Sequence, residues 1–105
     1  MKPVVRSQLA TADARSALAY YANEVGTDIA QRFLASLAAC YAAIAEAPGI
    51  GSAHIGYDLG IPGLRARRIP SFPFLAFYME QDDQIVIWRL LHEKRDFASW
   101  LAEGG

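Results

Sequence analysis

A group of cationic and titratable side chains lies between residues 65 and 95 of the sequence. The group comprises Arg65, Arg67, Arg68, Arg89, His92, Lys94 and Arg95. Metal-independent cleavage of RNA needs cations to stabilise the phosphate charge, a base for the 2′-hydroxyl proton and an acid for the leaving oxygen. The group therefore indicates either a nuclease or an arginine-bearing surface that binds another macromolecule.

A nuclease would draw on four of these residues, namely Arg65, Arg67, Arg89 and His92. Arg65 and Arg67 alternate along one predicted strand, so they share a face on which both could meet a phosphate. Histidine is the residue type that ordinarily exchanges a proton near neutral pH, and His92 is the one group of this region suited to proton transfer. Because a second proton-transfer partner is not evident, the sequence favours binding over RNA cleavage.

The same residues also have structural interpretations. A histidine at the end of a strand, such as His92, more often satisfies a hydrogen bond than it catalyses a reaction. Asp96 opens the last predicted helix and is favoured there by the helix dipole. Arg95 could pair with a strand carboxylate such as Glu80. Arg65 and Arg67 could simply be solvated strand residues.

The sequence predicts no cofactor and no metal site. Cys40 is the single cysteine, which excludes an intrachain disulfide and a cysteine-based metal cluster, and its apolar surroundings indicate a buried thiol. His54 has no second ligand at metal-binding spacing. Gly49-Ile50-Gly51 follows a predicted helix rather than a strand, which argues against a phosphate-binding loop.

Length and composition indicate one globular domain over residues 1–105, with 53% hydrophobic and 20% charged residues. A formal net charge of −1 disfavours a protein that coats nucleic acid, and we expect no sequence-specific nucleic-acid binding. The longest apolar run, from Leu37 to Ala45, is too short to cross a bilayer, and residues 1–6 contain no apolar core long enough for a signal peptide. We therefore expect a soluble, cytoplasmic protein.

Apolar residues at helical spacing predict two helices in the first half of the chain. Thr11 is expected to cap the first helix, with Asp13 in its first turn, and Gly26 to end it. Thr27 is expected to cap the second helix, which Pro48-Gly49 ends. Since almost no linker separates them, the helices must fold back as an antiparallel hairpin.

The second half of the chain is rich in predicted strands. Together with a short strand at the N-terminus, the predicted strands cover residues 3–9, 64–69, 74–79 and 85–91. Residues 48–63 contain five glycines and two prolines and are predicted to form a loop, and residues 96–101 a short helix. The order β-α-α-β-β-β-α predicts an α+β domain whose helical hairpin packs on one face of a small, mostly antiparallel sheet.

Five short motifs follow one another in this second half. They are Pro62-Gly63-Leu64-Arg65, Ile69-Pro70-Ser71-Phe72-Pro73-Phe74, Phe77-Tyr78, Ile87-Trp88-Arg89-Leu90-Leu91-His92 and Arg95-Asp96. With the helical hairpin and the Pro48-Gly49-Ile50-Gly51 segment before them, they resemble the ParE branch of the RelE/ParE toxins of type II toxin–antitoxin systems. The resemblance covers nearly the whole chain.

The resemblance implies a bacterial toxin that a cognate ParD-like antitoxin neutralises in a hetero-oligomeric complex. In the ParE branch it further implies that the toxin poisons DNA gyrase, and such a toxin needs no catalytic group or cofactor of its own. The RelE branch implies an alternative, a ribosome-dependent endoribonuclease that cuts messenger RNA. The near-neutral charge and the missing acid–base partner favour the gyrase-directed toxin.

Two binding surfaces are predicted for such a toxin. The gyrase-binding surface is placed on the arginines Arg65, Arg67, Arg89 and Arg95. The antitoxin-binding surface is predicted from an excess of large apolar side chains on the helices, which an amphipathic partner helix would cover. These side chains are Tyr20, Tyr21, Phe33, Leu34, Trp100 and Leu101.

Overall fold

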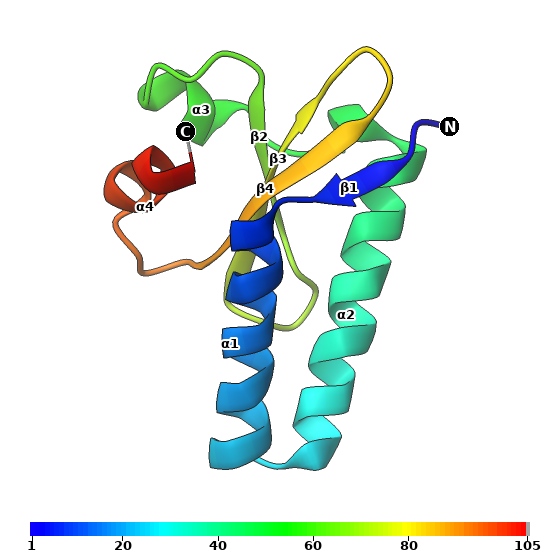
Figure 1. Cartoon of the computed structure of the whole chain (residues 1–105), viewed down its shortest axis with the longest axis vertical. Coiled ribbons are helices and arrows are strands. Elements are labelled where there is room, and N and C mark those ends of the chain that lie inside the picture. The colour runs from blue at the N-terminus through cyan, green and yellow to red at the C-terminus, as the bar shows by residue number, and fades with distance from the viewer. Residues whose placement is uncertain (105) are drawn as a thin grey trace.

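The computed structural model describes residues 1–104, with side chains for residues 1–102 (Figure 1). Its elements in chain order are β1 (Val4–Arg6), α1 (Gln8–Glu24), α2 (Thr27–Glu46), η1 (Pro48–Ile50), α3 (His54–Asp58), β2 (Leu64–Arg68), β3 (Phe74–Glu80), β4 (Ile85–His92) and α4 (Phe97–Gly104). This order confirms the predicted α+β class and adds two short helices, η1 and α3, before β2. None of the helices in the described part of the chain has the length and apolar character of a membrane span.

The strands form one sheet in the order β1-β4-β3-β2. The pairs β2–β3 and β3–β4 are antiparallel, whereas β1 runs parallel to β4. The first and last strands of the chain are therefore neighbours at one side of the sheet, and β2 forms the opposite edge. The prediction of a mostly antiparallel sheet is confirmed.

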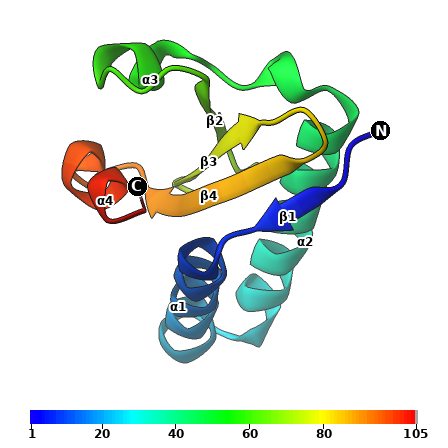
Figure 2. The ribbon, with the colours of Figure 1, turned by 45° about the horizontal axis from the view of Figure 1, so that its top comes forward.

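The helical hairpin of α1 and α2 covers one face of the sheet (Figure 2). Its core contains an aromatic cluster in which four rings pack with centroids 5.2 to 6.3 Å apart, namely Tyr21, Phe33, Phe72 and Phe74. Phe33 at the centre of this cluster has no exposed surface. The hairpin is therefore held to the sheet by large apolar side chains near the α1–α2 connection.

A second, smaller core lies on the opposite face of the sheet, under α3 and α4 (Figure 2). Its buried members are Leu64, Ala66, Phe77, Leu91 and Leu101. The apolar character of both faces of β3 and β4, visible in the sequence, is explained by these two cores.

The first strand is shorter than predicted because its last residues begin the helix. Ser7 is the N-cap of α1, and its hydroxyl oxygen accepts a hydrogen bond from the Ala10 N–H at 3.0 Å. The same hydroxyl donates to the Trp88 carbonyl on β4 at 2.6 Å. Ser7 thus replaces Thr11 as the cap, which places Asp13 beyond the first turn.

The glycine-rich segment 48–63, predicted to be a loop, contains the two short helices η1 and α3. Ser52 forms an isolated antiparallel bridge with Ala66 on the outer edge of β2. Gly56 in α3 packs so closely that a Cβ there would lie 2.5 Å from the Leu64 carbonyl oxygen. The glycine allows α3 to touch the backbone of β2, and this contact fixes the segment to the sheet.

Candidate functional site

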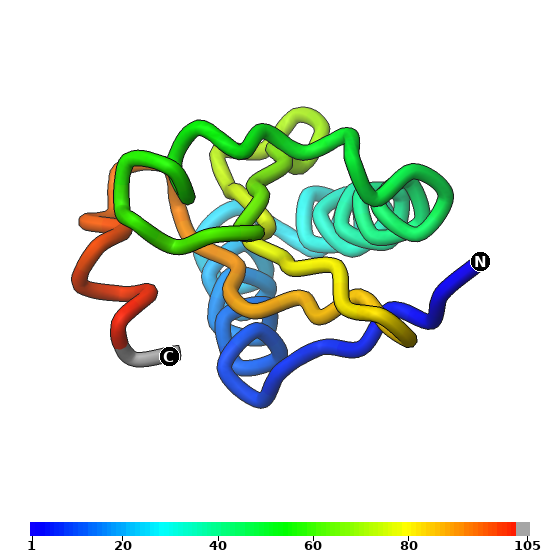
Figure 3. Tube along the Cα trace, turned by 90° about the horizontal axis from the view of Figure 1, so that it is seen from above, coloured from blue at the N-terminus to red at the C-terminus, as the bar shows by residue number. Residues whose placement is uncertain are grey.

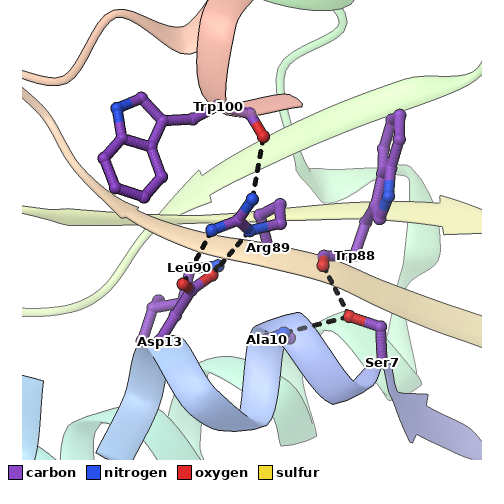
Figure 4. Close-up of polar contacts among 7 residues, drawn as sticks. All are labelled: Ser7, Ala10, Asp13, Trp88, Arg89, Leu90 and Trp100. Atoms are coloured by element: carbon purple, nitrogen blue, oxygen red, sulfur yellow. Dashed lines mark hydrogen bonds and ion pairs between the residues drawn. The ribbon is translucent and has the colours of Figure 1, made fainter. Parts of the chain in front are cut away.

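Arg89, predicted as a surface cation, is only 2% exposed. Its Nε and Nη2 donate to the two carboxylate oxygens of Asp13, each at 2.8 Å, and its Nη1 donates to the Trp100 carbonyl at 2.8 Å (Figure 4). Asp13 also accepts from the Leu90 N–H at 3.0 Å. The Asp13–Arg89 pair therefore joins α1, β4 and α4, and the prediction that Arg89 lies on a binding or catalytic surface is wrong.

Arg95 keeps its charge near the surface. Its guanidinium lies 4.5 Å from the centre of the Trp100 ring, a cation–π distance, and the residue is exposed. The suggested partner Glu80 instead accepts a hydrogen bond from Lys2 at 2.9 Å. Arg95 therefore marks an exposed cationic position beside α4.

Arg65 is directed at the chain's own backbone. Its Nη1 donates to the Gly51 carbonyl at 2.7 Å and, at a longer 3.4 Å, to the Gly49 carbonyl. Tyr78, its cross-strand partner on β3, donates its hydroxyl proton to the Pro48 carbonyl at 2.6 Å and accepts from the Gly51 N–H at 2.8 Å. We call this arrangement the 48–51 clamp, because two side chains from the sheet hold those four backbone residues.

A Tyr78→Phe variant is expected to lose about 1–3 kcal/mol of its free energy of unfolding. The substitution leaves the ring in place but removes the partner of the buried Gly51 N–H. Urea denaturation measures the effect, and Tyr57→Phe, at an exposed tyrosine, is the matched control. Equal stability of the two variants would show that the clamp does not stabilise the fold.

The two remaining arginines of β2 differ in their surroundings. Arg67 is half-buried, and its Nε has no hydrogen-bond partner among the described residues. Burial raises the pKa of the nearby Cys40 thiol, and the charge of Arg67 opposes that rise. Arg68 forms an exposed ion pair with Glu93. Of the two, Arg67 has the less complete set of partners.

The residues proposed for RNA cleavage do not come together. His92 pairs with Phe74 at the start of β3, whereas Arg65 pairs with Tyr78 four residues further along the same strand. His92 Nδ1 already accepts a hydrogen bond from the Lys94 N–H at 3.1 Å. With Arg89 buried and Arg65 in the 48–51 clamp, these four residues do not form a nuclease centre.

The described residues contain no group of three or more histidine, cysteine or acidic side chains that could hold a metal ion. His54 instead lies 3.2 Å from the Asp58 carboxylate on the next turn of α3. Both residues are thus accounted for by a local pair on the helix surface.

Comparison with known proteins decides the family. A family model described as "ParE toxin of type II toxin-antitoxin system, parDE" matches residues 4–97. The chain belongs to the ParE toxin family. Among solved structures, a chain of the chromosomal ParDE TA system from P. aeruginosa matches with a TM-score of 0.75 and 19% identity, covering 88% of this chain and 96% of that chain. No curated protein sequence matches significantly.

Membership of this family makes the chain the toxin of a type II toxin–antitoxin system and implies a complex with an antitoxin. The fold agrees with this assignment, because the likeness to the ParDE chain extends over most of both chains. The resemblance seen in the sequence motifs is thereby confirmed at the level of the family.

The apolar side chains predicted to bind the toxin's antitoxin fall into two groups. Phe33 and Leu101 are buried in the two cores, at 0% and 1% exposure, so the prediction that they lie on a free surface is wrong. Tyr21 and Trp100 are half-buried. Tyr20 and Leu34 are exposed at 59% and 47%, and they remain on the helix surface where a partner could reach them.

Sequence reasoning missed two exposed apolar residues and one partly buried acid. Val25 is 55% exposed at the end of α1, and Tyr57 is 86% exposed on α3. The signal for Tyr57 was a large aromatic residue within a glycine-rich segment. Asp13 offered no comparable signal, because its partner Arg89 lies 76 residues away in the chain.

Proposed function

We propose that this toxin stops growth by binding DNA gyrase and poisoning it, and that a cognate ParD-like antitoxin neutralises it. The observation that supports a binding toxin is the internal use of the candidate catalytic residues. Arg89 is neutralised by Asp13, and Arg65 donates to backbone carbonyls. A toxin of this kind acts through its surface and needs no reaction centre of its own.

The cations that stay available define the proposed target-binding surface. Arg95 is exposed beside Trp100, and Arg67 is half-buried at the edge strand β2. Arg89 is removed from this surface because its guanidinium donates to Asp13 and to the Trp100 carbonyl. Arg65 is set aside because its Nη1 donates to the Gly51 carbonyl within the toxin. We therefore keep Arg67 and Arg95 as candidate contacts with gyrase.

The antitoxin is proposed to cover the exposed apolar side chains of the hairpin, Tyr20, Val25 and Leu34. An amphipathic helix is the partner structure that fits an apolar helix surface, because its own apolar face would be buried there. Tyr21, beside Tyr20 with ring centroids 5.4 Å apart, would form the inner border of that contact.

A supercoiling assay with purified gyrase, run beside primer extension on a translated message, tests the proposed function. We expect the toxin, released from its antitoxin complex, to inhibit supercoiling and to accumulate cleaved DNA. The message should stay intact, and adding back the antitoxin should restore supercoiling. Cleavage of the message with unaffected gyrase would overturn the proposal in favour of a RelE-type endoribonuclease.

A further inference from the structure

The segment 48–63, which we call the 48–63 arm, is fixed to the sheet at three places. The 48–51 clamp holds its first turn through Arg65 and Tyr78. The Ser52 bridge to β2 holds the next residues through hydrogen bonds of 2.8 and 2.9 Å. The close packing of Gly56 on the Leu64 backbone holds α3. The arm is therefore anchored along the edge of the sheet.

The anchored arm presents one large aromatic side chain to solvent. Tyr57 is 86% exposed, compared with 59% for Tyr20 on the hairpin. The other side of α3 is partly buried, because Ile55 and Leu59 pack against the second core. Since α3 is anchored by that apolar side, Tyr57 is held outward by the fold.

The arm carries no charge that is free to bind a phosphate. His54 and Asp58 are its only titratable side chains besides Tyr57, and they pair with each other. Nucleic-acid binding depends on lysine and arginine contacts with phosphates, which the arm lacks. Tyrosine is enriched and charged residues are depleted in the centres of protein–protein interfaces. The chemistry of the arm therefore fits an uncharged pocket on another protein.

The position of the arm separates it from the exposed part of the hairpin. Figure 1 shows α3 at the opposite end of the molecule from the α1–α2 connection, and Figure 3 shows the arm running along the outside of the sheet edge. Val25, an exposed apolar residue of the proposed antitoxin contact, lies at the C-terminal end of α1 by that connection. One partner can thus contact the arm while another contacts the tip of the hairpin.

We propose that the 48–63 arm is a target-contact element of this toxin, and that Tyr57 inserts into an uncharged pocket of the target protein. The inference rests on the proposed function, in which that protein is gyrase. Because the clamp, the bridge and the α3 packing order the arm before binding, little conformational entropy is lost on contact. A buried tyrosine at such a contact is the type of residue that dominates binding energy.

Two variants of Tyr57 and one control variant test the role of the arm. Tyr57→Ala is expected to inhibit gyrase supercoiling at least about tenfold less well than the wild type while its antitoxin affinity stays within about twofold. Asp82→Ala, at an exposed position in the β3–β4 turn that belongs to neither proposed surface, is the control and is expected to keep both gyrase inhibition and antitoxin affinity. Growth arrest on induction and antitoxin affinity by calorimetry are measured for Tyr57→Ala and for the control. Tyr57→Phe, which keeps the ring, should retain most of the inhibition.

Each other outcome is decisive. Inhibition by Tyr57→Ala equal to wild type, with the antitoxin complex melting normally, overturns the inference and leaves the proposed function intact. Loss of antitoxin affinity in place of target inhibition also overturns it, because the arm would then bind the antitoxin. If the wild type fails to inhibit gyrase, the proposed function fails. In that case, growth arrest on induction tests whether the arm contacts a target. If Tyr57→Ala still arrests growth, the role of the arm is refuted. If the variant no longer arrests growth, the arm contacts a protein target other than gyrase.

Discussion

An Asp13→Ala variant is expected to lose about 3–5 kcal/mol of its free energy of unfolding. The substitution removes both carboxylate oxygens that accept from Arg89, whose side chain is only 2% exposed. A buried guanidinium without its counter-charge is strongly unfavourable, because little solvent is available to stabilise it. A loss of this size is a large fraction of the roughly 5–15 kcal/mol that a domain of this kind has in total.

Urea denaturation measures this loss, and Glu24→Ala, at an exposed acid on the same helix, is the matched control. Glu24→Ala should change the free energy of unfolding by less than about 0.5 kcal/mol. A double variant, Asp13→Leu with Arg89→Met, should recover much of the loss because no charge stays buried. Equal stability of Asp13→Ala and Glu24→Ala would contradict the structural role of the pair.

A Phe33→Ala variant is expected to lose a similar amount, about 3–5 kcal/mol. Its ring is fully buried and packs on Tyr21, Phe72 and Phe74 with centroids 5.3 to 5.6 Å away. Truncation would leave a cavity where α1 and α2 meet the sheet, and the surrounding rings could fill it only in part. Differential scanning calorimetry of the variant should show a markedly lower melting temperature.

The neighbouring residue separates stability from antitoxin binding. Leu34 follows Phe33 on α2 but is 47% exposed. We expect Leu34→Ala to keep nearly all of the stability and to weaken antitoxin binding, because its side chain lies on the proposed contact surface. If Phe33→Ala is stable and only loses antitoxin affinity, Phe33 is a surface residue after all and the described core packing is wrong.

The fold was largely predictable because its signals are local. Helical spacing of apolar residues predicted the hairpin, and the apolar runs at residues 74–79 and 85–91 predicted β3 and β4. The first strand was overextended because Ser7 has two compatible interpretations, a strand residue or a helix cap. Only the contact with Trp88 on β4 decides between them.

The candidate site was harder to predict because its contacts are distant in sequence. Arg89 lies within the apolar run of β4, which indicates burial, but nothing in the sequence identifies Asp13 as its partner. Arg65 donates to backbone carbonyls. Because every residue has a backbone carbonyl, the residue types do not show which one accepts the hydrogen bond. Whether each arginine faces solvent therefore depends on contacts with residues that are distant in the chain, and the sequence does not identify those contacts.

The parallel pairing of β1 with β4 has a consequence for synthesis on the ribosome. Ser7 and Trp88, which join these strands, are 81 residues apart in the chain. β1 can pair with β4 only after nearly the whole polypeptide has emerged from the ribosome. The ion pair between Arg89 and Asp13 forms at the same late stage. A chain that ends before β4 lacks the strand that pairs with both β1 and β3, so the four-stranded sheet can form only when synthesis is almost complete.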